Sequence, residues 1–247
     1  MPIQNKNIIL PNLITLLGMI CGVYSMVLAS NDSIVKASVF ILLAAVFDGL
    51  DGKVARLVNG ASEFGIQLDS LADLVSFGVA PAFLIYHWQL ESLGNVGVMA
   101  MFLFVACGAL RLARFNVQTK TVSNLFFVGM PIPGGAAIVV SSIMFVYKMG
   151  WQYDDLAIPY LVLTIFTAFL MVSTVPYYSF KKLGFIKAKP FNTIVILAVF
   201  IFIVGMAPEI TIFSVLMLYT LSGFVMLPMA KRLSLRGANK IEDPVDK

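Results

Sequence analysis

The chain has 247 residues, of which 60% are hydrophobic and 12% are charged, whereas a soluble domain has about 25% charged residues. The mean hydropathy of +0.93 also excludes an ordinary soluble domain. The net charge of +4 is too small to indicate binding of nucleic acid. Apolar runs of about 20 residues predict membrane-spanning helices and not a β-barrel. The expected fold is therefore an all-α, polytopic transmembrane helix bundle that forms a single membrane domain over residues 1–247.

About eight spans are expected along the chain. A short interfacial segment over residues 1–11, which breaks at Pro11, precedes the first of them. The expected helices cover residues 12–30, 33–58, 62–89, 95–115, 131–147, 155–177, 190–205 and 208–230. Residues 12–230 would form the bundle, and a polar tail over residues 231–247 would follow it.

The distribution of basic residues predicts the orientation of the bundle. Eight spans place both termini on one side of the membrane. That side then holds all but two of the 17 Lys and Arg residues, the exceptions being Lys36 and Lys148. Because short loops rich in Lys and Arg stay in the cytosol, we expect both termini to be cytoplasmic, in a bacterial or archaeal cell membrane.

The most distinctive stretch lies in the second and third expected helices, over residues 33–89. Asp48 and Asp51 are three residues apart on the second helix, and Asp69 and Asp73 are four residues apart on the third. These spacings place each pair on one face of its helix, so two antiparallel helices would bring the four carboxylates together. Carboxylates in so apolar a chain need a partner or a metal. An all-oxygen set without a nearby His or Cys suits Mg, Mn or Ca.

Small residues and one arginine share the faces of these aspartates. Gly52, Ala55 and Arg56 follow Asp48 by four, seven and eight residues, and Gly65 precedes Asp69 by four. The glycines leave room for a ligand to approach the backbone, and the planar guanidinium of Arg56 suits a phosphate. The residues alone therefore predict a metal site that handles a phosphate-bearing substrate, and that faces the cytosol.

The pattern D-x2-D-G-x2-A-R-x8-G-x3-D-x3-D resembles the signature of the CDP-alcohol phosphatidyltransferase family, and each of its fixed positions is filled. Members of that family transfer the phosphate-bearing part of a CDP-linked lipid or alcohol to an acceptor hydroxyl and release CMP. The resemblance covers about residues 8–140. It implies two divalent cations held by the four aspartates, nucleotide contacts by Gly52, Ala55, Arg56 and Gly65, and proton transfer from the acceptor to Asp73. No Ser-His-Asp or Cys-His set lies nearby, which favours direct attack by the acceptor.

Three further runs resemble those of the serine-using members of the family. They cover residues 69–81, 110–116 and 131–134. This resemblance implies CDP-diacylglycerol and L-serine as substrates. Serine brings a carboxylate and an ammonium group, which call for an arginine and oxygen acceptors, and the candidates are Arg111, Arg114 and Asn116. Both arginines could instead be topogenic residues that meet lipid phosphates.

Two alternatives stay open at this point. The same chemistry could use glycerol phosphate or inositol phosphate as the acceptor. A cation transporter could bind its ion at the acidic cluster, although this reading leaves the glycine and arginine spacings unexplained. Small residues in the spans would also allow close packing into a homodimer.

Overall fold

The computed structural model describes residues 8–58, 60, 62–118, 126–151, 156–178, 202 and 205–238. These residues belong to two compact units, one within Met1–Val122 and Pro131–Val172, the other within Ser123–Met130 and Ser173–Lys247. The expectation of a single membrane domain stays a prediction.

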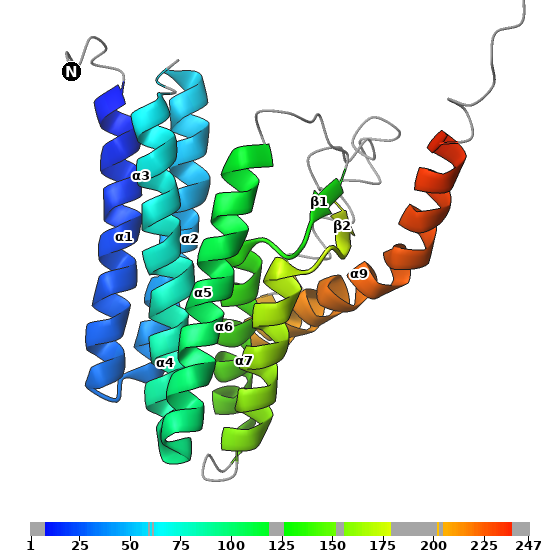
Figure 1. The fold of residues 1–247 in the computed structure, drawn as a ribbon. Coiled ribbons are helices and arrows are strands. Elements are labelled where there is room, and N and C mark those ends of the chain that lie inside the picture. The colour runs from blue at the N-terminus through cyan, green and yellow to red at the C-terminus, as the bar shows by residue number, and fades with distance from the viewer. Residues whose placement is uncertain are drawn as a thin grey trace, which may run out of the picture. The chain divides into compact units, whose positions relative to one another are not determined.

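The first unit is a bundle of helices (Figure 1). It contains α1 (Ile9–Ser30), α2 (Ile34–Leu57), α3 (Glu63–Asp73), α4 (Ala80–Trp88), α5 (Asn95–Gln118), α6 (Ile132–Met149) and α7 (Ala157–Val172). A π-helix, η2 (Leu74–Val79), joins α3 to α4, and a short 3-10 helix, η3 (Leu90–Leu93), precedes α5.

The helices confirm a polytopic membrane bundle. Within the described part of the chain, four helical stretches are long and apolar enough to cross a membrane, namely Ile9–Ser30, Glu63–Trp88, Asn95–Val117 and Ile132–Met149. Two shorter apolar helices cover Ala157–Val172 and Pro208–Gly223. Helix α2 has 24 residues, which is long enough to span, but it also carries Asp48 and Asp51.

The second unit holds a small sheet that the sequence did not predict. Strand β1 (Phe126–Val128) pairs antiparallel with β2 (Pro176–Tyr178), and α9 (Pro208–Ala238) packs against β2. The prediction of a span over 155–177 was therefore wrong at its end, because α7 stops at Val172. Proline disfavours a helical conformation in the residue before it, which accounts for the extended chain at Pro176. Helix α9 also continues past residue 230, so part of the expected tail is helical.

The amino-terminal expectation also needs correction. Helix α1 begins at Ile9 and includes Pro11 in its first turn, so Pro11 does not break the chain there. A proline fits this position because the first N–H groups of a helix have no partner within the helix. Residues 1–7 of the interfacial segment, most of the expected span over 190–205, and residues 239–247 lie outside the described residues.

One face of α1 is made of small residues and packs closely on its neighbours. Its buried residues are Pro11, Thr15, Gly18, Gly22, Ser25 and Ala29. The Ser25 hydroxyl donates to the Ala37 carbonyl of α2 at 2.9 Å, and the Ser76 hydroxyl of η2 donates to the Gly18 carbonyl at 3.3 Å. Helix α1 packs against both α2 and α3, which are in much less contact with each other. The two acid-bearing helices are thus held together mainly through α1.

The π-helix lies between Asp73 and Pro81. Proline inside a helix lacks the N–H donor and its ring crowds the carbonyl four residues earlier, which here belongs to Phe77. The π-helix bonds with the wider spacing, as the N–H of Ala80 donates to the Val75 carbonyl. Such a turn is one of the recognised ways in which a helix accommodates a local mismatch. It keeps Glu63–Trp88 continuous despite the proline.

Replacing Gly22 with Ala is expected to destabilise the bundle. The added Cβ would lie 2.8 Å from both Cα and Oγ of Ser76, so α1 and η2 would have to separate. Overpacking of this kind costs about 1–3 kcal/mol. The matched control is Gly49→Ala, because a Cβ at Gly49 meets no atom within 4 Å. A lower Tm in detergent for Gly22→Ala alone is the expected result, and equal Tm values would contradict the close packing.

Candidate metal centre

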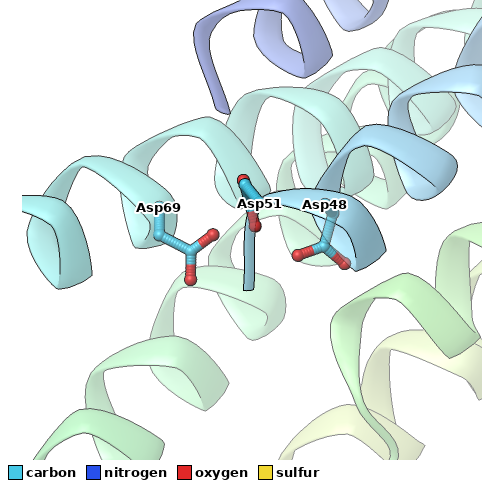
Figure 2. Close-up of side chains that lie close together, drawn as sticks. All are labelled: Asp48, Asp51 and Asp69. Atoms are coloured by element: carbon cyan, nitrogen blue, oxygen red, sulfur yellow. The ribbon is translucent and has the colours of Figure 1, made fainter. Parts of the chain in front are cut away.

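Three aspartates converge between α2 and α3. Asp48 and Asp51 come from the carboxyl-terminal half of α2, and Asp69 comes from α3. One oxygen of each carboxylate lies within 4.8 Å of the others, and Figure 2 shows the side chains gathered around one region. Asp51 is the most enclosed of the three, at 6% exposed. The i,i+3 and i,i+4 spacings do place these carboxylates together.

The start of α3 is fixed by a side-chain cap. The Ser62 Oγ accepts a hydrogen bond from the Gly65 N–H at 3.0 Å, and Glu63 lies in the first turn. Both features stabilise a helix amino terminus, and they confirm the start predicted for this helix. Because the helix begins there, Gly65, Asp69 and Asp73 follow one another on one face.

Asp73 ends α3, one turn beyond Asp69. It is not a member of the converging trio, but it interacts electrostatically with Asp48, Asp69 and Arg111. It also lines a cavity of about 10 Å³ with all three of the other aspartates and with Phe77. The four predicted acids therefore surround one small region, with Asp73 at its edge.

A cleft of about 150 Å³ opens beside Asp51 and Asp69. Its other lining residues are Pro11, Asn12, Thr15, Gly52, Ala55, Gly60, Ser62, Gly65 and Ile66. A Cβ on Gly52 would meet no atom within 4 Å, so there is free space beside this part of the lining. A Cβ on Gly65 would lie 3.1 Å from Asn12 Oδ1, so here the backbone itself forms the wall.

Arg56 does not line this cleft. Its Nε donates to the Gly52 carbonyl at 2.9 Å, within its own helix, and its side chain is exposed. Of the four residues predicted to contact a nucleotide, the structure therefore brings Gly52, Ala55 and Gly65 to the cleft and leaves Arg56 outside its lining.

The three residues predicted to recognise serine point in different directions. Arg111 is 9% exposed, interacts electrostatically with Asp73, and lies with its guanidinium carbon 5.2 Å from the centre of the Phe115 ring. The Nη1 of Arg114 donates to the Val172 carbonyl of α7 at 3.0 Å. The Nδ2 of Asn116 donates to Ser70 Oγ of α3 at 2.9 Å. Only Arg111 is directed to the acidic centre.

Helix α1 supplies residues that the sequence analysis missed. Pro11, Asn12 and Thr15 line the cleft, and the Thr15 hydroxyl donates to Asp51 Oδ2 at 2.6 Å. One signal was available: Thr15 precedes Gly18 and Gly22 by three and seven residues, which places a polar residue on the close-packing face of the helix.

The acidic centre fits a divalent cation. Carboxylates this close repel one another strongly in an apolar setting. Within the described ranges, neither Lys nor Arg forms a salt bridge with Asp48, Asp51 or Asp69. Hard divalent cations prefer all-oxygen ligands of this kind. The donor set therefore suits Mg, Mn or Ca, as the sequence predicted.

Comparison with known proteins agrees with this geometry. Residues 8–172 match the model of the CDP-alcohol phosphatidyltransferase family, and the chain belongs to that family. The family was predicted from the signature, and the match extends beyond residue 140 to the end of α7.

The similar curated relatives include three that differ in origin. The CDP-diacylglycerol–serine O-phosphatidyltransferase of Helicobacter pylori is 40% identical over 182 residues, which cover 74% of this chain and 76% of the relative. The protein of the same name from Mycobacterium leprae is 35% identical over 221 residues, or 85% and 72% of the two chains. An archaetidylserine synthase of Methanothermobacter thermautotrophicus is 39% identical over 172 residues, or 69% and 70%.

Replacing Gly52 with Leu is expected to block the cleft without disturbing the fold. The new side chain would extend from a position with free space around its Cβ into the cavity where the CDP-linked substrate would bind. Crowding of about 1–3 kcal/mol would raise the KM for this substrate about 5- to 150-fold. Gly49→Leu is the control, because Gly49 lies on the same helix, also in free space, but away from the cleft lining. An unchanged KM in Gly52→Leu would place the substrate elsewhere.

Proposed function

We propose that this chain transfers the phosphatidyl group of CDP-diacylglycerol to the hydroxyl of L-serine, giving phosphatidylserine and CMP. The observation that carries the proposal is the trio of carboxylates beside a cleft lined by the small residues of the family signature. The relatives from H. pylori and M. leprae are named for serine and CDP-diacylglycerol, and the archaeal relative is named for archaetidylserine. Serine is thus the feature shared by all three names, whereas the lipid part differs.

The reaction proceeds by direct attack. The serine hydroxyl oxygen forms a bond to the phosphorus of the phosphatidyl group, and the bond from that phosphorus to the bridging oxygen of CMP breaks. The electron pair of the broken bond leaves with CMP, and Asp73 accepts the hydroxyl proton. Two divalent cations bound by the four aspartates would neutralise the charge of the diphosphate and of the leaving group.

The neighbouring signature residues accommodate the nucleotide. Gly52, Ala55 and Gly65 provide a wall without bulky side chains, so a flat base and its ribose can approach the helix backbone. Arg56 lies outside the cleft lining but bonds to Gly52, which is part of that lining, and it would exchange the Gly52 carbonyl for a phosphate oxygen, a stronger charge-assisted partner.

Serine recognition is assigned chiefly to Arg111. Its guanidinium is enclosed and interacts electrostatically with Asp73, the proton acceptor. A serine whose carboxylate pairs with Arg111 would therefore have its hydroxyl close to Asp73. Arg114 and Asn116 contribute from the sides, by fixing α5 against Val172 of α7 and against Ser70 of α3.

The proposed topology has eight spans, with both termini and the active site in the cytosol of a bacterial or archaeal cell. It is supported by the concentration of Lys and Arg on one side and by the bacterial and archaeal origin of the relatives. The two shorter apolar helices and α2 would add to the four long candidate spans. A homodimer is a further proposal, supported by the small residues in the spans.

A headgroup-transfer experiment tests the proposed function. Purified protein in detergent is given CDP-diacylglycerol, Mn or Mg, and labelled serine, glycerol phosphate or inositol phosphate in parallel. CMP release is expected with serine, and Asp73→Asn should lower it about 10²- to 10⁴-fold because the proton acceptor is lost. Asp32→Asn, in the turn between α1 and α2, is the control carboxylate. Release with another acceptor would overturn the substrate, and no release with any acceptor would overturn the transferase.

Replacing Arg111 with Ala is expected to raise the KM for serine about 10- to 100-fold, as loss of a hydrogen bond to a charged group costs about 1.5–3 kcal/mol. The KM for CDP-diacylglycerol should stay unchanged. Arg111→Lys should recover part of the loss, because it keeps the charge without the planar fork.

The matched comparison is Arg114→Ala, which removes a hydrogen bond to α7 and should affect Tm more than the KM for serine. An unchanged serine KM in both variants would assign the arginines to topology or lipid contact instead. An equal rise in both would contradict the separate roles given to them here.

A further inference from the structure

Thr15 lies on the closely packed face of α1, and this face is directed toward the acidic centre. The residue is 6% exposed and lines both the cleft and the small cavity beside the aspartates. Its hydroxyl oxygen is 2.6 Å from Asp51 Oδ2 and 3.1 Å from the Pro11 carbonyl oxygen. A hydroxyl has one proton to donate, so it can serve only one of these acceptors at a time.

The carboxylate is the better acceptor of the two. A hydrogen bond to an ionised oxygen is shorter and stronger than one to a neutral carbonyl, and the shorter contact is the one to Asp51. The Pro11 carbonyl is also four residues before Thr15, where an α-helix offers it the backbone N–H of Thr15. The hydroxyl is therefore available to Asp51.

The hydrogen bond from Thr15 to Asp51 connects α1 to α2 at the acidic centre. Asp51 is on α2, and Thr15 is on α1, which packs against α3 as well. Three residues along α1, the Gly18 carbonyl accepts the hydroxyl of Ser76, which follows Asp73 by three residues. Helix α1 thus bonds to both acid-bearing segments within one of its own turns.

We infer that Thr15 is a positioning residue for the metal centre, an inference that depends on the proposed metal-binding role of the aspartates. Its hydroxyl occupies Oδ2 of Asp51 and fixes the carboxylate plane, which leaves Oδ1 to bind the cation. Asp51 is only 6% exposed, so the orientation of its carboxylate depends mainly on contacts with other protein groups. Groups that orient a metal ligand in this way typically change metal affinity or activity about 10- to 100-fold when they are removed.

Binding of Mn²⁺ to the purified protein, followed by electron paramagnetic resonance without substrate, tests this inference. Thr15→Val keeps the shape of the side chain and loses the hydroxyl, so Mn²⁺ should bind about 10- to 100-fold more weakly. Thr15→Ser keeps the hydroxyl and should bind as the wild type does. Thr15→Ala provides a second hydroxyl-free variant if valine disturbs the packing. In transfer experiments the Mn²⁺ requirement should rise more than the KM for serine.

Thr164→Val is the matched control. Thr164 is a fully buried threonine of α7 whose hydroxyl donates to the Tyr160 carbonyl of its own helix at 2.7 Å. This variant should bind Mn²⁺ normally, even if its Tm falls as much as that of Thr15→Val. Asp51→Asn removes a proposed metal ligand, so the Mn²⁺ binding that it loses is the binding at the acidic centre.

The outcomes separate the two proposals. If the wild type binds Mn²⁺ and Asp51→Asn does not, but both hydroxyl-free variants bind normally, the role of Thr15 is overturned and the metal centre stands. Weak binding in Thr15→Ser to the same degree as in Thr15→Val would also overturn it, because the hydroxyl would then not be the cause. A wild type that binds no Mn²⁺ would overturn the metal centre itself, and the role of Thr15 with it.

Discussion

The repulsion among carboxylates gathered in an apolar bundle is the constraint on which the rest of this structure depends. Asp48 and Asp51 approach Asp69 from a different helix, although α2 and α3 are in little direct contact. The proposed function needs an open space between these helices, because the cation and the diphosphate of the substrate would have to enter it. Helix α1 meets both requirements, close acids and separated helices, because it packs against α2 and α3 with a face of small residues. It keeps the acids close without filling the space between them.

Spacing within a helix was enough to predict most of the acidic centre. The three- and four-residue steps from Asp48 to Asp73 predicted shared faces, and the start expected at residue 62 is one residue before the first residue of α3, Glu63. Contacts between distant segments were not predictable in this way. Thr15 is 36 residues from Asp51 and lies in an apolar span, where only its spacing to Gly18 and Gly22 marks it, and this spacing does not name its partner. The pairing of β1 with β2 is likewise a long-range contact between two short segments.

The residues expected to recognise serine show what helical periodicity can predict: the face on which a residue begins, but not the partner of its side chain. Arg111 and Arg114 are three residues apart, so they begin on similar faces of α5. Their partners are nevertheless different, because the long guanidinium side chains reach different neighbours. The end of α7 offers Arg114 a carbonyl, and Asp73 attracts Arg111. The sequence placed both arginines at the same end of the bundle, but only the positions of α3 and α7 distinguish them.

The π-helix changes how the residues after Asp73 lie relative to the acidic centre. In a regular α-helix, the four-residue stripe through Gly65, Asp69 and Asp73 would continue through Phe77 on the same line. The wider turn shifts this line, and Phe77, which is 1% exposed, lines the cavity that the aspartates share. That cavity measures about 10 Å³, room for one water molecule at most. A cation held by the aspartates would therefore have an aromatic ring beside it, with room for at most one water molecule in this cavity.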